Sequence, residues 1–309
     1  MAGVRIMMHQ HVNRFLHLHR ALGKAFHAHE IALHEFAAFI MERSASHLTS
    51  ALILEWAGKA STPDGARTRF DRARALAVFL HAEDIRHEIP AAGFLGRSRR
   101  RRPAPHILER EQIGRIMDEA LLVPARTPIS PLTYHHVFGL LASTGLRISE
   151  ALALRCQDLT TDGILVRKGK FGKARLVPLH QSTRAALDRY LLVRRTVRNA
   201  GEDLFVLGHG HAPTSTRIHV VFVRIARKLG YRDPTGPGPR VHDLRHTFAV
   251  RSLEACGNDA QAVLRHMRAL STYLGHVDIA NTYWYLEATP VLLRTIATSA
   301  EQEWIGGAA

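Results

Sequence analysis

The sequence predicts a mainly α-helical protein with a small antiparallel β-sheet, divided into an all-helical N-terminal domain and an α+β C-terminal domain. Three observations indicate this fold class. Apolar residues recur at helical spacing along most of the 309-residue chain. Two short β-rich segments flank a glycine-containing turn near the middle. An arginine- and proline-rich stretch, residues 97–105, separates two regions that each have the length of a domain.

The N-terminal domain, residues 1–96, is expected to consist of helices alone. Residues 12–57 carry apolar side chains at helical spacing, and these should face the core. They are Leu16, Leu22, Phe26, Ile31, Phe36, Phe39 and Ile40. A later helix is predicted over residues 67–81 by the same spacing of its apolar residues.

The stretch of residues 97–105 is expected to be a linker. It reads Arg-Ser-Arg-Arg-Arg-Arg-Pro-Ala-Pro. Its like charges repel one another, and proline lacks the amide hydrogen that a helix needs, so this stretch should not enter a core. We expect its central arginines to contact the phosphates of bound DNA, namely Arg99, Arg100, Arg101 and Arg102.

The C-terminal domain, residues 106–288, is expected to combine helices with a hairpin. Apolar spacing predicts helices over residues 113–121, 132–142, 147–152, 182–198 and 218–225. Ser182 is the expected N-cap of the fourth of these helices. The β-rich segments 164–166 and 176–177 predict a hairpin with a basic tip. A short strand is expected at residues 204–207.

The charge balance indicates a polyanionic partner. The chain has 42 Lys and Arg against 27 Asp and Glu, a net charge of +15, which favours nucleic acid or an anionic membrane surface. No apolar run reaches the roughly 18–20 residues that span a bilayer, and residues 1–10 lack the features of a signal peptide. We therefore expect a cytoplasmic protein, associated with the nucleoid if its partner is DNA. His29 and His34 are five residues apart rather than four, and Cys156 and Cys256 do not form a ligand set, so no metal site is predicted.

A cationic cluster lies beside a tyrosine in the last third of the chain. It comprises the run His242-Asp243-Leu244-Arg245-His246-Thr247, then Leu274-Gly275-His276, and Tyr285. His242 and Arg245 are three residues apart and share one face of a helix. Arginine offers a fixed charge and bidentate hydrogen bonds to phosphodiester oxygens, and Arg147 at a predicted helix start is a second candidate. The cluster therefore predicts that Tyr285 attacks a phosphodiester held by these cations.

These motifs, in this order, resemble those of the tyrosine recombinase (phage integrase) family. The matching segments are Thr144-Gly145-Leu146-Arg147-Ile148-Ser149-Glu150, the block from His242 to Thr247, Leu274-Gly275-His276 and Tyr285. The segment from Lys170 to His180 and the run Asn281-Thr282-Tyr283-Trp284-Tyr285 look most like the transposon- and integron-associated integrase branch. The resemblance covers residues from about 106 to 290. It implies a core-binding domain at 1–96 that clamps duplex DNA, joined by the linker to a catalytic domain at 106–288.

The resemblance implies a catalytic set of Arg147, Lys170, His242, Arg245, His276 and Tyr285. The tyrosine would form a 3′-phosphotyrosine and release a 5′-hydroxyl, with no metal, ATP or other cofactor. Lys170 would protonate the leaving oxygen as general acid. The two arginines and His276 would bind non-bridging oxygens, and His242 would accept a proton or donate a hydrogen bond to the phosphate.

The choice of nucleophile leaves alternatives. Tyr273 and Tyr283 also lie near the expected place, and the nine-residue spacing from His276 favours Tyr285. His246 is expected to have a structural or supporting role.

The basic tip of the hairpin leaves alternatives for the general acid. Lys168 and Lys173 compete with Lys170, and the resemblance to the family's hairpin favours Lys170. Lys168, Lys173 and Arg175 are then expected to bind DNA phosphates. Glu150 is expected to orient nearby basic groups or to close a helix contact.

The resemblance also implies an assembly on DNA. Four protomers would bring two duplex sites together and exchange strands through a Holliday junction, and accessory DNA-bending proteins could take part. The tail, residues 289–309, begins with Thr289-Pro290, a pair that suits a helix start. Its apolar stripe would dock on a neighbouring protomer, with packing on its own domain as the alternative. Two rival functions are a monomeric type IB topoisomerase-like enzyme and a DNA-binding protein without catalysis, and the latter has no need of Tyr285.

Overall fold

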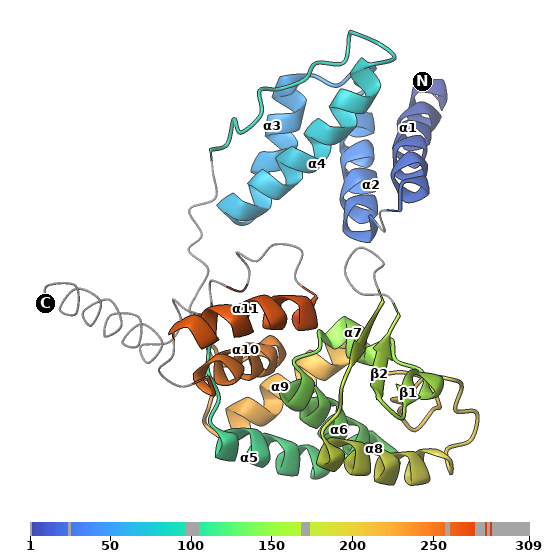
Figure 1. Cartoon of the computed structure of the whole chain (residues 1–309). Coiled ribbons are helices and arrows are strands. Elements are labelled where there is room, and N and C mark those ends of the chain that lie inside the picture. The colour runs from blue at the N-terminus through green and yellow to red at the C-terminus, as the bar shows by residue number, and fades with distance from the viewer. Residues whose placement is uncertain are drawn as a thin grey trace, which may run out of the picture. The chain divides into compact units, whose positions relative to one another are not determined.

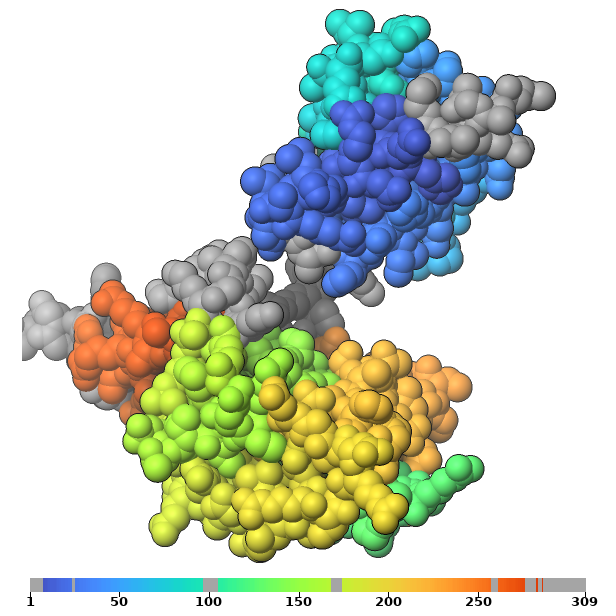
Figure 2. Space-filling model, turned by 90° about the vertical axis from the view of Figure 1, so that its right-hand side faces the viewer, coloured from blue at the N-terminus to red at the C-terminus, as the bar shows by residue number. Residues whose placement is uncertain are grey.

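The computed structural model describes residues 2–23, 26–96, 105–167, 174–256 and 260–275, together with residues 282 and 285. The chain divides into two compact units, Met1–Arg102 (unit 1) and Pro103–Ala309 (unit 2), coloured blue to cyan and green to orange in Figures 1 and 2. The division falls within the predicted linker. Residues 97–104 lie outside the described residues, so the linker and its arginines stay a prediction.

The described part of unit 1 is helical, as predicted. Its helices are α1 (Ala2–Ala21), α2 (His27–Glu42), α3 (Ser50–Gly58) and α4 (Pro63–His81). Helix α1 packs on α2 and α3 packs on α4. The hydroxyl groups of Thr49 and Thr62 cap α3 and α4 by accepting backbone N–H bonds. Among the described residues, no helix is both long and apolar enough to cross a membrane.

The predicted core of unit 1 is wrong at two positions. Leu22 and Ile31 are 65% and 66% exposed, whereas Leu16 and Phe36 are buried as expected. The reason is a break between α1 and α2, where Phe26 adopts a left-handed conformation with φ of 54°. An apolar spacing counted across this break assigns the wrong helical face to the residues beside it.

Unit 2 combines helices with a small antiparallel sheet, which confirms the predicted fold class (Figure 1). Its described elements are α5 (Arg110–Leu121), α6 (Ile129–Thr144), α7 (Ile148–Leu152), η1 (Cys156–Asp158), β1 (Leu159–Thr160), β2 (Gly163–Val166), β3 (Arg175–Val177), α8 (Gln181–Arg194), α9 (Ser215–Lys228), α10 (Val241–Glu254) and α11 (Ala260–Leu274). The strand order is β1-β2-β3. The predicted hairpin is confirmed, and Val166 pairs with Arg175 at its last described rung.

Two local predictions in unit 2 are wrong. Helix α8 is capped by His180, whose ring accepts the N–H of Ser182, so Ser182 lies inside the helix rather than at its N-cap. Residues 204–207 form no strand: Leu204 and Phe205 lie in a bend, and the side chains of Leu204, Phe205 and Val206 are buried. Side chains take the place of a partner strand here, since the Tyr190 hydroxyl accepts the N–H of Val206 and the Thr133 hydroxyl donates to its carbonyl.

We predict that the two units unfold separately. Phe36 and Phe222 are fully buried in the cores of unit 1 and unit 2, respectively. Truncating either to alanine should cost its own unit about 3–5 kcal/mol, because the core does not refill the cavity. Calorimetry should show two unfolding transitions. Phe36→Ala should lower the midpoint temperature of one, and Phe222→Ala that of the other. A single transition that both variants lower equally would contradict this division.

Candidate active site

The turn between α6 and α7 is built so that the Gly145 carbonyl faces Arg245. Gly145 follows α6 with φ of 62°, a left-handed conformation that favours glycine. A Cβ atom at Gly145 would also lie 2.5 Å from Cδ1 of Phe248, so no larger residue fits. The Gly145 carbonyl accepts a hydrogen bond of 2.6 Å from Nη1 of Arg245. The spacing in Thr144-Gly145-Leu146-Arg147 thus reflects a helix end followed at once by a helix start.

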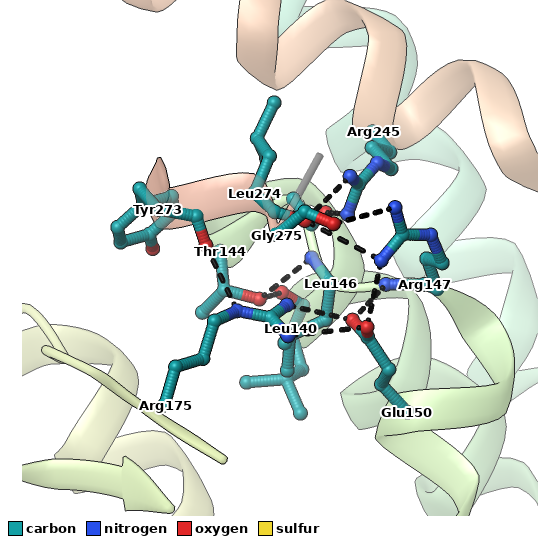
Figure 3. Close-up of polar contacts among 11 residues, drawn as sticks. Leu140, Thr144, Leu146, Arg147, Glu150, Arg175, Arg245, Tyr273, Leu274 and Gly275 are labelled. Atoms are coloured by element: carbon teal, nitrogen blue, oxygen red, sulfur yellow. Dashed lines mark hydrogen bonds and ion pairs between the residues drawn. The ribbon is translucent and has the colours of Figure 1, made fainter. Parts of the chain in front are cut away.

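Glu150 holds Arg147 at the start of α7. The Arg147 backbone N–H donates to Oε2 of Glu150 (3.0 Å), and its Nη1 donates to Oε1 (2.8 Å). The same carboxylate receives two further bonds from Arg175, to Oε2 at 2.8 Å and to Oε1 at 3.2 Å. Figure 3 shows Glu150 between the two guanidinium groups. The expectation that Glu150 orients nearby basic groups is confirmed.

The C-terminal end of α11 is the second anchor of the arginines. The Leu274 carbonyl accepts bonds from Nη2 of Arg245 (2.8 Å) and Nη1 of Arg147 (3.4 Å), and the Gly275 carbonyl accepts one from Nη2 of Arg147 (3.2 Å). Terminal carbonyls lack partners within their helix and carry partial negative charge. Arg147 and Arg245 therefore converge on one helix end, as Figure 3 shows.

Burial and neighbouring charges change two pKa values in this cluster. Burial lowers the pKa of Arg245 to about 10, and the positive charge of Arg147 adds to this effect. Arg245 is still a cation near pH 7. For Glu150, burial alone would raise the pKa, but the hydrogen bonds from Arg175 and Arg147 outweigh it and hold the pKa below its ordinary value. The site is therefore a set of fixed cations around one ionised carboxylate.

Helix α10 carries three of the residues in the candidate cluster. Its start is fixed by Asp243, which is fully buried and accepts the Arg240 backbone N–H at 2.7 Å. In the first two turns, Arg245 and His246 are each 2% exposed, whereas His242 is exposed to solvent. The His242 and His246 rings lie 4.4 Å apart and nearly perpendicular.

The candidate nucleophile contacts His246, for which the sequence predicts a structural or supporting role. The Tyr285 hydroxyl and Nδ1 of His246 are 3.1 Å apart, within hydrogen-bond distance. Tyr285 is 2% exposed and belongs to the apolar cluster that includes Leu274. The sequence offered little signal for this contact, because 39 residues separate the two partners.

Several predicted site residues lie outside the described residues. They are Lys168, Lys170, Lys173, His276 and the arginines from Arg99 to Arg102. Arg175 is described, and its guanidinium group binds Glu150 and the carbonyl of Tyr273. Within the described part of the chain, no group of three or more His, Cys, Asp or Glu side chains is arranged to hold a metal ion.

Comparison with known proteins identifies the class of enzyme as site-specific recombinases that use a tyrosine. Residues 106–290 match the model of the phage integrase family. The putative integrase/recombinase y4rB of Sinorhizobium fredii is 37% identical over 306 residues, which cover 96% of this chain and 97% of that protein. Tyrosine recombinase XerD of Brucella suis is 29% identical over 83% of this chain and 82% of its own.

Two solved structures share the fold at low sequence identity. A XerH site-specific recombinase bound to its difH substrate has a TM-score of 0.65 at 18% identity, covering 88% of this chain and 79% of that one. The Tn1549 transposon integrase bound to transposon right end DNA has a TM-score of 0.64 at 18% identity, covering 96% and 99%. The chain belongs to the phage integrase family. It is a tyrosine-type site-specific DNA recombinase, and members of its family act through a 3′-phosphotyrosine intermediate.

We predict that Glu150→Gln destabilises unit 2 in a pH-dependent way. Removing the negative charge leaves two guanidinium groups around a side chain that is 4% exposed, which should cost about 3 kcal/mol at pH 7. Because the folded-state pKa lies below the unfolded value, the ionised carboxylate contributes its stability above about pH 4.3, the ordinary pKa of Glu. The difference between wild type and variant should therefore shrink as pH falls below that value. Denaturant titrations at pH 7 and pH 3.5 measure the free energy of unfolding of both proteins. An equal difference between wild type and variant at the two pH values would contradict the assignment of an ionised Glu150.

Proposed function

We propose that Arg147, Arg245, His242 and His276 hold the scissile phosphate, that Tyr285 attacks it, and that Lys170 protonates the leaving group. The observation that carries this proposal is that Arg147 and Arg245 converge on the end of α11. The Tyr285 hydroxyl lies beside His246, which directly follows Arg245 on α10. Backbone carbonyls hold both guanidinium groups in place, and a fixed guanidinium group suits the bidentate binding of a phosphate.

The proposed reaction is balanced by one proton donor and one nucleophile. The Tyr285 oxygen gives its proton to His242, the acceptor that the family resemblance implies, and forms a bond to phosphorus; the surrounding cations favour the loss of that proton. The bond from phosphorus to the 5′ oxygen breaks, and the Lys170 ammonium gives a proton to that oxygen. The two arginines stabilise the charge that builds up on the non-bridging oxygens. Rejoining runs the same steps in reverse with the 5′-hydroxyl of another strand, so the bond energy is kept.

We predict that Tyr285→Phe abolishes the covalent adduct and keeps DNA binding. The test uses a nicked duplex that carries a recombination site of this enzyme, incubated with protein and EDTA and resolved on a denaturing gel. Wild type should form a protein–DNA adduct and the variant none, because the phenylalanine ring has no nucleophilic oxygen. Tyr283→Phe is the matched control and should still form the adduct. An adduct that persists in Tyr285→Phe would exclude this tyrosine as the nucleophile.

The tail, residues 289–309, is proposed to dock on unit 2 of a neighbouring protomer, so that protomers assemble into a tetramer on two DNA sites. Its proposed acceptor is a pocket of about 850 Å³ between α5, α6, α8 and α10. Apolar groups such as Ile113, Met117 and Phe248 line it, with Arg110 and Arg251 also at its wall. An apolar helix face with polar edges fits such a lining.

We predict that filling this pocket blocks assembly. A Cβ atom at Gly114, which lines the pocket, meets nothing within 4 Å, so Gly114→Trp can place its ring in the cavity without backbone strain. Binding of a second protomer to two-site DNA should weaken by at least about tenfold, as it should after deletion of residues 289–309. Gly114→Ala is the control and should assemble normally. Normal assembly of Gly114→Trp would rule out this pocket. Relaxation of supercoiled DNA by a monomer, without strand exchange, would favour the topoisomerase-like alternative.

A further inference from the structure

We propose that Arg175 is a positioning residue of the recombination reaction. It would hold three parts of the active site together without contacting DNA: the hairpin that carries Lys170, the phosphate clamp Arg147, and the segment that leads to His276. This inference rests on the proposed roles of those residues. It replaces the phosphate contact that the sequence alone suggested for Arg175.

The first connection runs from Arg175 to the phosphate clamp through Glu150. Arg175 binds the carboxylate in a bidentate manner, and the same two oxygens bind the backbone and side chain of Arg147. Two parallel hydrogen bonds to a carboxylate fix both distance and orientation. A shift of Arg175 therefore changes the orientation of Glu150 and, through it, that of Arg147.

The second connection runs from Arg175 to the end of α11. Its Nε donates to the Tyr273 carbonyl at 2.9 Å. The guanidinium group also packs over Gly275, where an added Cβ atom would lie 3.1 Å from Nη1 and 3.3 Å from Cζ. Gly275 has φ of 65° and immediately precedes His276 in the chain. The Arg175 guanidinium group thus packs against Gly275, the residue directly before His276.

The third connection is the strand on which Arg175 stands. Arg175 begins β3 and pairs with Val166, the last residue of β2. The eight residues 167–174 join the two strands and include Lys170. Anchoring Arg175 therefore anchors the base of the loop that carries the proposed general acid. Figure 2 shows the surface of the hairpin strands beside that of α11, in agreement with the bond from Arg175 to Tyr273.

The surroundings of Arg175 favour positioning over phosphate binding. Its side chain is 15% exposed, against 50% for Arg167 at the other end of the same loop. Three of its N–H groups are committed to Glu150 and Tyr273 (Figure 3). Turning it toward DNA would leave the buried carboxylate with one arginine instead of two, which is unfavourable.

The test compares Arg175→Gln, Arg175→Lys and Arg167→Gln in the full chain. Arg167 is the matched control, because it also joins this hairpin to a buried carboxylate, that of Asp158 instead of Glu150. Each variant is assayed for folding by circular dichroism, for DNA affinity at several salt concentrations, and for cleavage rate at saturating protein. Three suicide substrates are used: the natural phosphodiester, a 5′-bridging phosphorothiolate, and a methylphosphonate at the scissile position.

The expected result is a loss of rate without a loss of binding. Arg175→Gln should cleave the phosphodiester about 100-fold more slowly, the loss that a misplacement of about 1 Å can cause. Its affinity and salt dependence should match wild type. The phosphorothiolate should recover part of the rate, because a thiolate leaves without a proton and needs Lys170 less. The methylphosphonate should recover another part, because it removes a charge that Arg147 stabilises. The cleavage rate of Arg175→Lys should lie between those of wild type and Arg175→Gln, and the rate of Arg167→Gln should be close to that of wild type.

Other outcomes would overturn the assignment. Weaker binding with a salt slope reduced by about one, and a normal rate at saturation, would make Arg175 a phosphate contact. An equal rate loss in Arg167→Gln would show general loosening of the hairpin. If Arg175→Gln does not fold, Arg175→Lys decides between these outcomes by the same measurements.

Two further variants separate this inference from the proposed function. Lys170→Ala should be rescued by the phosphorothiolate and Arg147→Ala by the methylphosphonate. Absence of these rescues would exclude the proposed roles of Lys170 and Arg147 themselves. Rescue of both, with none in Arg175→Gln, would overturn only the role of Arg175.

Discussion

The contact between one buried carboxylate and two arginines is the interaction on which the site depends. Arg147, Arg175 and Arg245 carry like charges within one small region, and like charges repel strongly where water is scarce. Glu150 offsets this repulsion for the first two, and the carbonyls at the end of α11 do so for all three. Without these groups, the cations would separate or turn to solvent, and the proposed phosphate site would not be preformed.

The same constraint explains why two helices end at glycine beside the site. Gly145 and Gly275 both have left-handed backbone conformations, after α6 and α11 respectively. The last carbonyls of a helix need partners from outside it. Here Arg245 donates to the Gly145 and Leu274 carbonyls, and Arg147 donates to the Leu274 and Gly275 carbonyls. The arginines therefore complete the helix ends, and these bonds fix the positions of their guanidinium groups.

The sequence predicted local features of the site better than its long-range contacts. Glu150 stands three residues after Arg147 at a helix start, a spacing that by itself indicates a side-chain bond to the helix N-terminus. The hairpin followed from its β-rich segments. The bonds of Arg175 to Tyr273 and of His246 to Tyr285 join residues 98 and 39 positions apart, and no periodicity encodes such pairs. The apolar composition of residues 204–207 predicts a strand wrongly, because a buried segment has this composition whether a partner strand or a side chain such as Tyr190 binds its backbone.

Helix α10 links the proposed phosphate site to the proposed acceptor pocket. Arg245 and His246 face the site, and Phe248, two residues on, lines the pocket. The Phe248 ring also packs so closely on Gly145 that a methyl group there would overlap it. Gly145 in turn accepts a hydrogen bond from Arg245. A tail that enters the pocket must contact the ring that packs on this turn, so docking and phosphate binding would act on the same few atoms. Protein interiors are close-packed, so little empty space separates the Phe248 ring from Gly145. A movement of the ring toward Gly145 would therefore also shift that residue.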